Sequence, residues 1–138
     1  MDSLHADMIP EVYKVSDGDA VEKEELKSIL EKENKILLGA FEGEQMIAYA
    51  HLEIRDRSES KNFKKRRSIY INSVGVDTQY QGRGVGKAIM TAVESEARSH
   101  GCEYIDLDVW EKNSNATSFY EFLGYSVKMR KMSKKLEG

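Results

Sequence analysis

Short apolar runs recur along the chain, and their spacing predicts strands. Residues 104–110 alternate cleanly between apolar and other side chains, which is the pattern of a half-buried strand. Residues 36–41 form a mostly apolar run, and the Glu42-Gly43-Glu44 sequence after it is typical of a tight hairpin turn. The predicted strands are residues 36–41, 45–54, 68–76, 104–110 and 125–132. The polar, charged segment 55–67 is predicted to be a loop.

Apolar residues at a spacing of four predict helices between these strands. The clearest helix carries Val85, Ile89, Val93 and Ala97 on one face, and Gly101 marks its end. The other predicted helix boundaries are Asp17 or Asp19 as the cap of an earlier helix, Asn113 or Ser114 as the cap of a later one, and Gly124 as its end. The resulting order, ββ followed by βαβαβ, predicts a mixed α/β sheet.

The stretch Gln81-Gly82-Arg83-Gly84-Val85-Gly86-Lys87 carries the clearest chemistry. Its glycines permit a tight turn, and they also let backbone N–H groups approach a bulky ligand. The start of a helix adds unpaired N–H donors and about half a unit of positive charge, which together favour a phosphate or diphosphate. The P-loop does not match, because Lys87 is followed by Ala88 instead of Ser or Thr. The dinucleotide fingerprint does not match either, because these glycines alternate strictly.

What remains is the order Gln-x-x-Gly-x-Gly, which resembles the acyl-CoA diphosphate loop of the GCN5-related N-acetyltransferases, the GNAT superfamily. A second segment, Asn113-Ser114-Asn115-Ala116-Thr117-Ser118-Phe119-Tyr120-Glu121-Phe122-Leu123-Gly124-Tyr125, resembles the family's Asn-x-x-Ala-x-x-Phe-Tyr-x-x-x-Gly-Phe pattern. Tyr125 stands in place of the final Phe. The two motifs occur in the family's order, and the resemblance covers roughly residues 36–130.

The resemblance implies an α/β fold with a GNAT-like mixed, mostly antiparallel sheet, a splayed parallel central strand pair and flanking helices. The front of the chain departs from the family pattern. Residues 4–14 read as a link into a helix, so we expect the family's first strand and helix to be absent or rudimentary and the domain to be shortened at the N-terminus. An open sheet edge would favour a homodimer.

The resemblance also implies acetyl-CoA as co-substrate. In the family, the strand before the glycine loop splays from its neighbour and pairs with the pantetheine arm. The N–H of Val74 is then the expected oxyanion donor, and Gly75 suits the bulge that causes the splay. Asn113 matches a family position that contacts the coenzyme, although a plain helix cap explains it equally well. The expected coenzyme-binding residues are Val74, Gly75, Val76, Gln81, Gly82, Arg83, Gly84, Val85, Gly86, Lys87, Asn113 and Tyr120.

Tyr120 matches the family's tyrosine that protonates the sulfur of coenzyme A, which makes it the expected general acid. The general base stays open. Many relatives place Glu where this chain has Asn72, and an amide cannot take up a proton at neutral pH. Asp108 and Glu53 are the alternatives, and each is also explained as a solvated carboxylate on a strand. A water relay, or an acceptor amine with a lowered pKa, would need neither.

The composition bounds the number of domains and the class of binding partner. The chain has 138 residues, of which 40% are hydrophobic and 33% are charged, so we expect one domain, residues 1–138, with a buried core. The net charge of −3 gives no general case for a nucleic-acid partner. Residues 61–67 form a basic cluster that would suit a nucleic acid, an acidic acceptor or the coenzyme's 3′-phosphate, but a solvated loop explains it as well.

Cysteine and histidine usage adds little chemistry. The single Cys102 cannot form an internal disulfide, which favours a reducing cytoplasm. His5, His51 and His100 are scattered, so no metal site is expected. No apolar run approaches the length that crosses a membrane, so no membrane partner is expected.

The expected function is an N-acetyltransferase that moves an acetyl group from acetyl-CoA to a primary amine by direct transfer in a ternary complex. The acceptor is a small molecule, a peptide N-terminus or a lysine. Two other classes stay open. One is a coenzyme A-binding regulatory module without catalysis, which Asn72 and the shortened front would favour. The other is a nucleotide-binding protein unrelated to acyl transfer.

Overall fold

The computed structural model describes residues 10–15, 34–110 and 112–137. These residues belong to two compact units, Met1–Leu107 and Asp108–Gly138, and each unit is described by itself. The expected single domain stays a prediction. The helix predicted to start at Asp17 or Asp19 lies outside the described residues.

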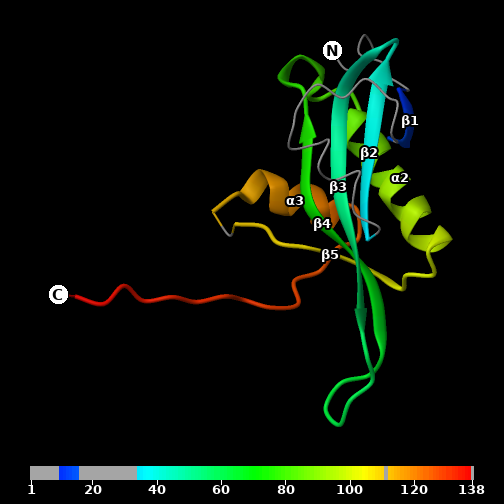
Figure 1. Ribbon diagram of the computed structural model, residues 1–138. Helices are drawn as coiled ribbons and strands as arrows, with labels where there is room; N and C mark the ends of the chain where they lie inside the picture. Colours follow the sequence, from blue (N-terminus) through cyan, green and yellow to red (C-terminus); the bar gives the residue numbers. More distant parts are fainter. Residues whose placement is uncertain (1–9, 16–33, 111, 138) are drawn as a thin grey trace. The chain divides into compact units, whose positions relative to one another are not determined.

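The first unit contains one sheet whose strands lie side by side in chain order (Figure 1). The strands are β1 (Glu11–Lys14), β2 (Lys35–Glu42), β3 (Gln45–Arg57), β4 (Arg66–Val76) and β5 (Tyr104–Leu107). Neighbouring strands pair antiparallel from β1 to β4, and β4 pairs parallel with β5. This arrangement confirms the predicted mixed, mostly antiparallel sheet. The predicted hairpin turn is confirmed as well, because Glu42 pairs with Gln45 across Gly43, which has a φ of 60°.

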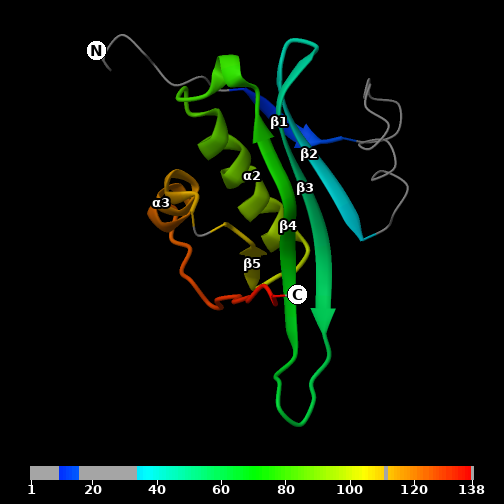
Figure 2. The same cartoon turned by 90° about the vertical axis from the view of Figure 1, so that its left-hand side faces the viewer.

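The prediction of a loop over residues 55–67 is wrong at both ends. The β3–β4 ladder continues to the pair Arg57 and Arg66, past the last residues that pair with β2 and β5 (Figures 1 and 2). Charged side chains do not prevent strand pairing when both faces of the ribbon meet water. Here they also pair across the strands, since the Arg67 Nη1 lies 2.7 Å from an oxygen of Asp56.

The prediction that residues 4–14 are a link into a helix is wrong for Glu11–Lys14, which form the edge strand β1. This strand has only 4 residues, which agrees with the expectation of an absent or rudimentary first strand. The Tyr13 ring stacks on Phe41, with the ring centroids 4.7 Å apart. The Val15 N–H donates to the Leu37 carbonyl at 2.8 Å, and the Val15 side chain is buried. These contacts with β2 fix the segment as a strand, and its own four residues show too little alternation to reveal this.

The main core lies between one face of the sheet and α2 (Val85–Ser99), which runs along that face (Figure 2). The predicted helical stripe is confirmed, because its residues and Met90 are buried. Alternate sheet residues complete this layer, namely Ile36, Leu38, Ala40, Ala48, Ala50, Leu52, Ile69 and Ile71. The helix ends at His100, and Gly101 follows with a φ of 71°, as its position predicts.

The second unit holds one helix in its described part, α3 (Ser114–Phe122). The predicted strand over residues 104–110 ends at Leu107, and the predicted strand over 125–132 is absent from the described residues, which have no regular structure there. An alternating pattern forms a strand only when a neighbour strand and a buried face stabilise it. Val127 is 72% exposed and Met129 is 85% exposed, so neither side chain has a buried face to join.

Candidate functional site

The glycine stretch forms a tight turn between a short 3₁₀ helix, η2 (Thr78–Tyr80), and the start of α2. Gly82 and Gly84 both adopt left-handed backbone conformations, with φ angles of 75° and 82°. Side chains other than glycine are strained in this region, which explains two of the three alternating glycines. A Cβ added at Gly82 would meet nothing within 4 Å, so the outer side of the turn is open.

The backbone N–H groups in the first turn of α2 have no acceptor among the described residues. The first helical hydrogen bond runs from the Ala88 N–H to the Gly84 carbonyl at 3.0 Å. Gly84 is the N-cap, no side chain caps the helix, and its first turn has no acidic residue. The N–H groups of Val85, Gly86 and Lys87 are therefore available, with the positive end of the helix dipole behind them. A diphosphate fits this donor set, which is the part of acetyl-CoA that these residues would hold.

The turn is tied to the sheet by polar contacts that the sequence did not reveal. The Gln81 side-chain amide donates to the Val76 carbonyl at 3.3 Å. The Asp77 N–H donates to the Ile47 carbonyl on β3 at 2.8 Å, and an Asp77 carboxylate oxygen accepts from the Gln79 N–H at 3.0 Å. Gln81 thus positions the turn relative to the end of β4. The direction of its side chain was not predictable from the motif alone.

The bulge in β4 lies at Asn72, not at Gly75 as predicted. Leu52 pairs with Ile71 and His51 pairs with Ser73, so Asn72 is the extra residue on β4. Gly75 pairs regularly with Tyr49. Glycine is required there for space, because a Cβ at Gly75 would lie 2.7 Å from the Cε1 atom of Tyr49.

The bulge coincides with the point where β4 loses its parallel neighbour. The last pair between β4 and β5 is Ile71 with Leu107. In the described residues β4 then continues from Asn72 to Val76 with no β5 residue beside it. Alternate backbone groups along this edge are left without a sheet partner, as at any strand edge. Val74, Gly75 and Val76 lie on this free edge, which leads directly to the glycine turn.

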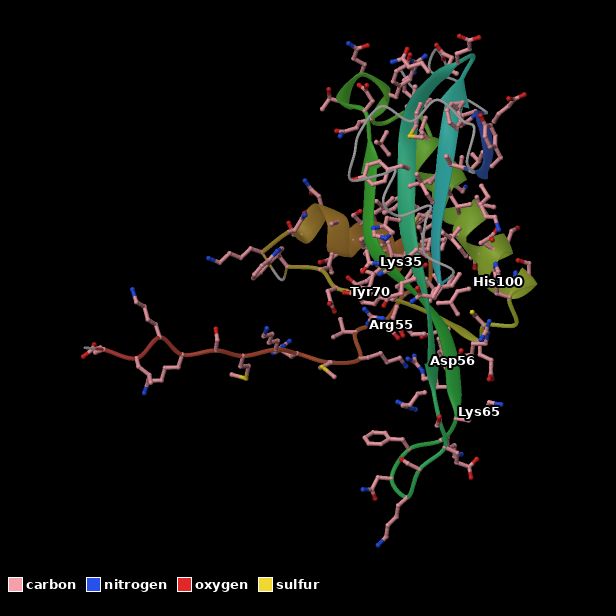
Figure 3. The ribbon with its side chains drawn as sticks, viewed as in Figure 1. Lys35, Arg55, Asp56, Lys65, Tyr70 and His100 are labelled. Carbon is pink, nitrogen blue, oxygen red and sulfur yellow. The ribbon has the colours of Figure 1, made fainter. Side chains whose placement is uncertain are left out.

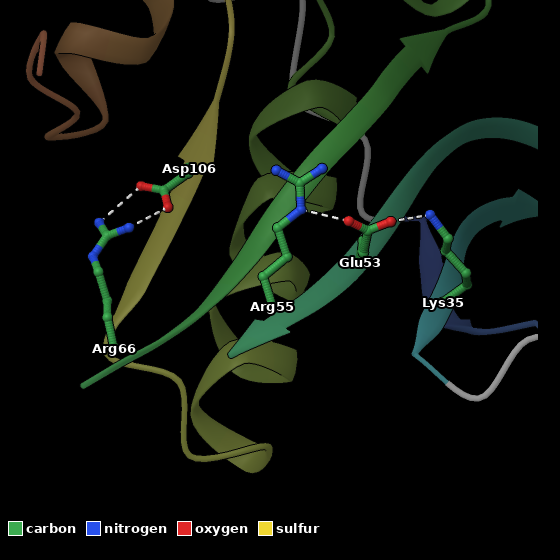
Figure 4. Close-up of polar contacts among 5 residues, drawn as sticks. All are labelled: Lys35, Glu53, Arg55, Arg66 and Asp106. Carbon is green, nitrogen blue, oxygen red and sulfur yellow. Dashed lines mark hydrogen bonds and ion pairs between the residues drawn. The ribbon is translucent and has the colours of Figure 1, made fainter. Parts of the chain in front are cut away.

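A row of charged and aromatic side chains crosses the other end of the sheet (Figures 3 and 4). Glu53 accepts from both Lys35 and Arg55. The Arg55 guanidinium also lies 3.9 Å from the centroid of the Tyr70 ring. The hydrogen bonds from Lys35 and then Arg55 lower the pKa of Glu53 below its ordinary value. A carboxylate held by two cations is a poor proton acceptor at neutral pH, and the role of Glu53 as general base stays a prediction.

A second ion pair in the row joins β4 to β5. The Arg66 guanidinium makes a bidentate contact with Asp106, with atom pairs at 2.7 and 3.1 Å (Figure 4). It also lies 4.0 Å from the centroid of the Tyr104 ring. The hydrogen bonds that Arg66 donates to Asp106 raise the pKa of Arg66. This contact fixes β5 against β4 just before the point where the two strands part.

His51 is a site residue that the sequence did not single out. It lies on β3 between Leu37 of β2 and Ser73 of β4. Its Nε2 atom is buried and has no hydrogen-bond partner among the described residues. Burial lowers the pKa of His51 most, and the charge of Lys35 lowers it further. The alternation of residues 45–54 could have shown that His51 shares a face with Tyr49 and Glu53. It could not have shown that the His51 Nε2 atom lacks a hydrogen-bond partner among the described residues.

The second unit carries Asn113, Tyr120 and Asp108. The Asn113 side chain caps α3 by accepting from the Ala116 N–H at 3.1 Å, as its position predicts. Tyr120 is half-buried between aromatic neighbours, with the Tyr125 ring centroid at 5.8 Å. Burial raises the pKa of Tyr120, so its hydroxyl stays protonated at neutral pH. Their coenzyme and catalytic roles stay predictions, as does that of Asp108.

No group of three or more His, Cys, Asp or Glu side chains in the described part of the chain is placed to hold a metal ion. No helix in those ranges is both long enough and apolar enough to cross a membrane.

Comparison with known proteins identifies what this chain is similar to. A family model described as the acetyltransferase (GNAT) family matches residues 2–125. Thialysine N-epsilon-acetyltransferase of Mus musculus is 36% identical over 58 residues, which make up 42% of this chain and 34% of the mouse protein. The matched segment therefore spans only about a third of that relative's length.

Solved structures share the fold. The tetramutant of the BH1408 protein from Bacillus halodurans has a TM-score of 0.77 and 25% identity, and the match covers 85% of this chain and 76% of that one. AAC(6')-Iy, solved with the bisubstrate analog CoA-S-monomethyl-acetylneamine, has a TM-score of 0.75 and covers 95% of this chain and 100% of its own. At 14% identity, this second likeness shows the fold alone.

Proposed function

This chain belongs to the acetyltransferase (GNAT) family, and we propose that it moves an acetyl group from acetyl-CoA to a primary amine by direct transfer in a ternary complex. One observation carries the proposal. The free edge of β4, from the bulge at Asn72 to Val76, leads into a turn and helix start whose N–H groups have no acceptor in the part of the chain that the structure describes. The extended pantetheine arm of acetyl-CoA would pair with the strand edge, and its diphosphate would accept from the N–H groups of the turn and helix start.

The residues of the first unit would bind and orient the co-substrate, which supplies an activated thioester. The turn Gln81–Lys87 holds the diphosphate through backbone N–H groups, and the exposed Arg83 and Lys87 add positive charge. Val74, Gly75 and Val76 line the arm, and the Val74 N–H stabilises the carbonyl oxygen as it becomes negative. In the second unit Tyr120 donates the proton that the departing sulfur needs, and its raised pKa keeps the hydroxyl protonated until that step. Asn113 contacts the coenzyme.

Calorimetric titration with acetyl-CoA and, separately, with ATP tests the binding site. We expect acetyl-CoA to bind and ATP to bind far more weakly, whereas the reverse would favour a nucleotide-binding protein. Gly84→Val should abolish acetyl-CoA binding, because a side chain at φ 82° distorts the turn and occupies the phosphate position. Gly43→Val is the matched control, since Gly43 has a φ of 60° and lies at the β2–β3 hairpin. Equal loss of affinity in both variants would contradict the assignment of the turn.

Turnover with a panel of amines tests catalysis. Tyr120→Phe should lower kcat by about 100-fold or more while changing the KM for acetyl-CoA little, because only the proton donor is lost. Tyr104→Phe is the control, since Tyr104 is 46% exposed and a phenylalanine ring can still lie under Arg66. Unchanged turnover in Tyr120→Phe would remove Tyr120 from the mechanism. Binding without turnover of any amine would indicate a coenzyme A-binding module.

The acceptor is proposed only as a primary amine of a small molecule or a peptide. The mouse relative is named for thialysine and AAC(6')-Iy was solved with a neamine conjugate, so the matches point to no single acceptor. We propose a cytoplasmic location, which a single cysteine favours. A homodimer is proposed through β1, which is an end strand of the described sheet. Light scattering at micromolar concentration tests it, and a result of monomer alone would count against it.

A further inference from the structure

The buried position of the His51 Nε2 atom is energetically unfavourable, and neither coenzyme binding nor proton donation by Tyr120 explains it. Its side chain shares a face of β3 with Tyr49 and Glu53, opposite the face that α2 covers. The Nε2 atom has almost no solvent contact and no hydrogen-bond partner in the described part of the chain. A buried polar atom without a partner is rare in native proteins, and water or a ligand commonly supplies the missing contact at functional positions.

The position of His51 relative to β4 is the second observation. His51 pairs directly with Ser73, the residue that follows the bulge at Asn72. Val74, the proposed oxyanion donor, is the next residue along β4 and pairs with Ala50. Opposite residues of an antiparallel pair lie about 4.5–5.5 Å apart at Cβ. The imidazole therefore lies one strand away from the backbone that would hold the thioester carbonyl.

The charges around His51 favour its neutral form. On its own face Lys35 of β2 and Glu53 of β3 are the described charged groups that act on it, with Tyr49 beside it and the uncharged Ser73 across from it. Burial and Lys35 lower the pKa of His51, and Glu53 opposes them with a smaller effect. At neutral pH the ring is uncharged and can take up a proton. Glu53 cannot compete, because Lys35 and Arg55 already occupy its carboxylate.

We propose that His51 is the general base of the acetyl transfer and that its Nε2 atom receives the amine proton through one bound water. The inference rests on the proposed function. The amine nitrogen forms a bond to the acetyl carbonyl carbon, and the carbon–sulfur bond breaks. The proton that leaves the nitrogen passes to His51, and the departing thiolate takes a proton from the acid Tyr120. One water suits this position, because it gives the buried Nε2 atom the partner that it lacks.

His51→Gln tests the proposal, with His100→Gln as the matched control. His100 is the C-cap of α2, and its Nε2 atom lies 3.0 Å from Glu96. Its carbonyl accepts from Arg67 at the start of β4, at the other end of that strand from Val74. We expect His51→Gln to lower kcat by about 100-fold or more with the dissociation constant for acetyl-CoA unchanged, and His100→Gln to change neither. The wild-type kcat should fall in acid with a midpoint below the ordinary histidine pKa of 6.5, and this acid limb should vanish in His51→Gln. A wild-type kcat and acid limb in the folded variant would overturn the proposal.

A second measurement needs no acceptor. Nitrogen-15 NMR of the acetyl-CoA complex reports which ring nitrogen of His51 carries the proton. We expect Nε2 to be unprotonated at pH 7 and the pKa to lie below 6.5. A protonated Nε2 at pH 7 would also overturn the proposal, since that nitrogen could not accept. Acetyl-CoA titration keeps the two ideas separate, because failure of the wild-type protein to bind would contradict the proposed function first.

Discussion

The two units of the molecule position their candidate residues in different ways. All the buried hydrophobic residues of the described chain lie between Val15 and Ala97, within the first unit. The described residues of the second unit include none, and α3 has no buried residue. In the first unit, strand register and core packing place the glycine turn and His51. In the second, the cap and local ring contacts of α3 hold Asn113 and Tyr120.

Truncating a buried side chain of the first unit should destabilise the protein more than truncating a side chain of the second. Ile89→Ala removes a fully buried side chain from α2 and should lower the free energy of unfolding by about 2–5 kcal/mol. Phe122→Ala removes a side chain that is 80% exposed and should change it by less than about 0.5 kcal/mol. Urea denaturation of both variants measures the difference. Similar losses would show that the second unit has a core that burial did not reveal.

Gly75→Ala tests whether the first unit needs glycine at this position because the Tyr49 ring leaves little space. The new methyl group would lie 2.7 Å from the Tyr49 ring, so we expect a loss of about 1–3 kcal/mol in the free energy of unfolding. Combining it with Tyr49→Ala should remove most of that penalty, because the clashing ring is then absent. A double-mutant cycle by urea denaturation measures this coupling. Additive losses would mean that Gly75 is required for its backbone and not for space.

Asn113→Ala tests the local hydrogen bonds of the second unit. Losing the cap on the Ala116 N–H should weaken α3 by about 1 kcal/mol. Amide hydrogen exchange along α3 measures the effect. Asn115→Ala is the control, because Asn115 lies inside the helix, is exposed and should gain slightly from alanine's higher helix propensity. Unchanged exchange in Asn113→Ala would show that other contacts set the start of α3.

The smallest expected effect concerns Glu53. Its pKa is lowered in the folded state, so its contribution to stability is present above the ordinary value of 4.5 and is lost as pH falls below it, through the folded pKa. Glu53→Gln should therefore lower Tm at pH 7 by a little, equivalent to at most about 1 kcal/mol, and the difference from wild type should shrink as pH falls below 4.5. Melting curves across this range measure it, and Glu59→Gln, at an exposed position, is the control. A difference that does not shrink as pH falls below 4.5 would count against the ion pairs as its cause.

Local signals predicted the parts of the site that depend on nearby residues. The alternating glycines and the helix stripe placed the turn at the start of α2, and Asn113 was one of the two residues predicted to cap α3. Predictions failed where the outcome depends on distant segments. Residues 11–14 become a strand through contacts with Phe41 and Leu37, and residues 125–132 lack the neighbour that a strand needs.

The amino-acid sequence alone determined the family, the mixed sheet and the glycine turn at the start of α2, because periodicity, glycine conformation and capping act within a few residues. Tertiary structure decided the rest. Only the register between β3 and β4 puts the bulge at Asn72 and His51 opposite Ser73. Only the approach of Lys35 and Arg55 lowers the basicity of Glu53. Register and burial join residues far apart in the chain, so the reactivity of a side chain is settled when the strands meet.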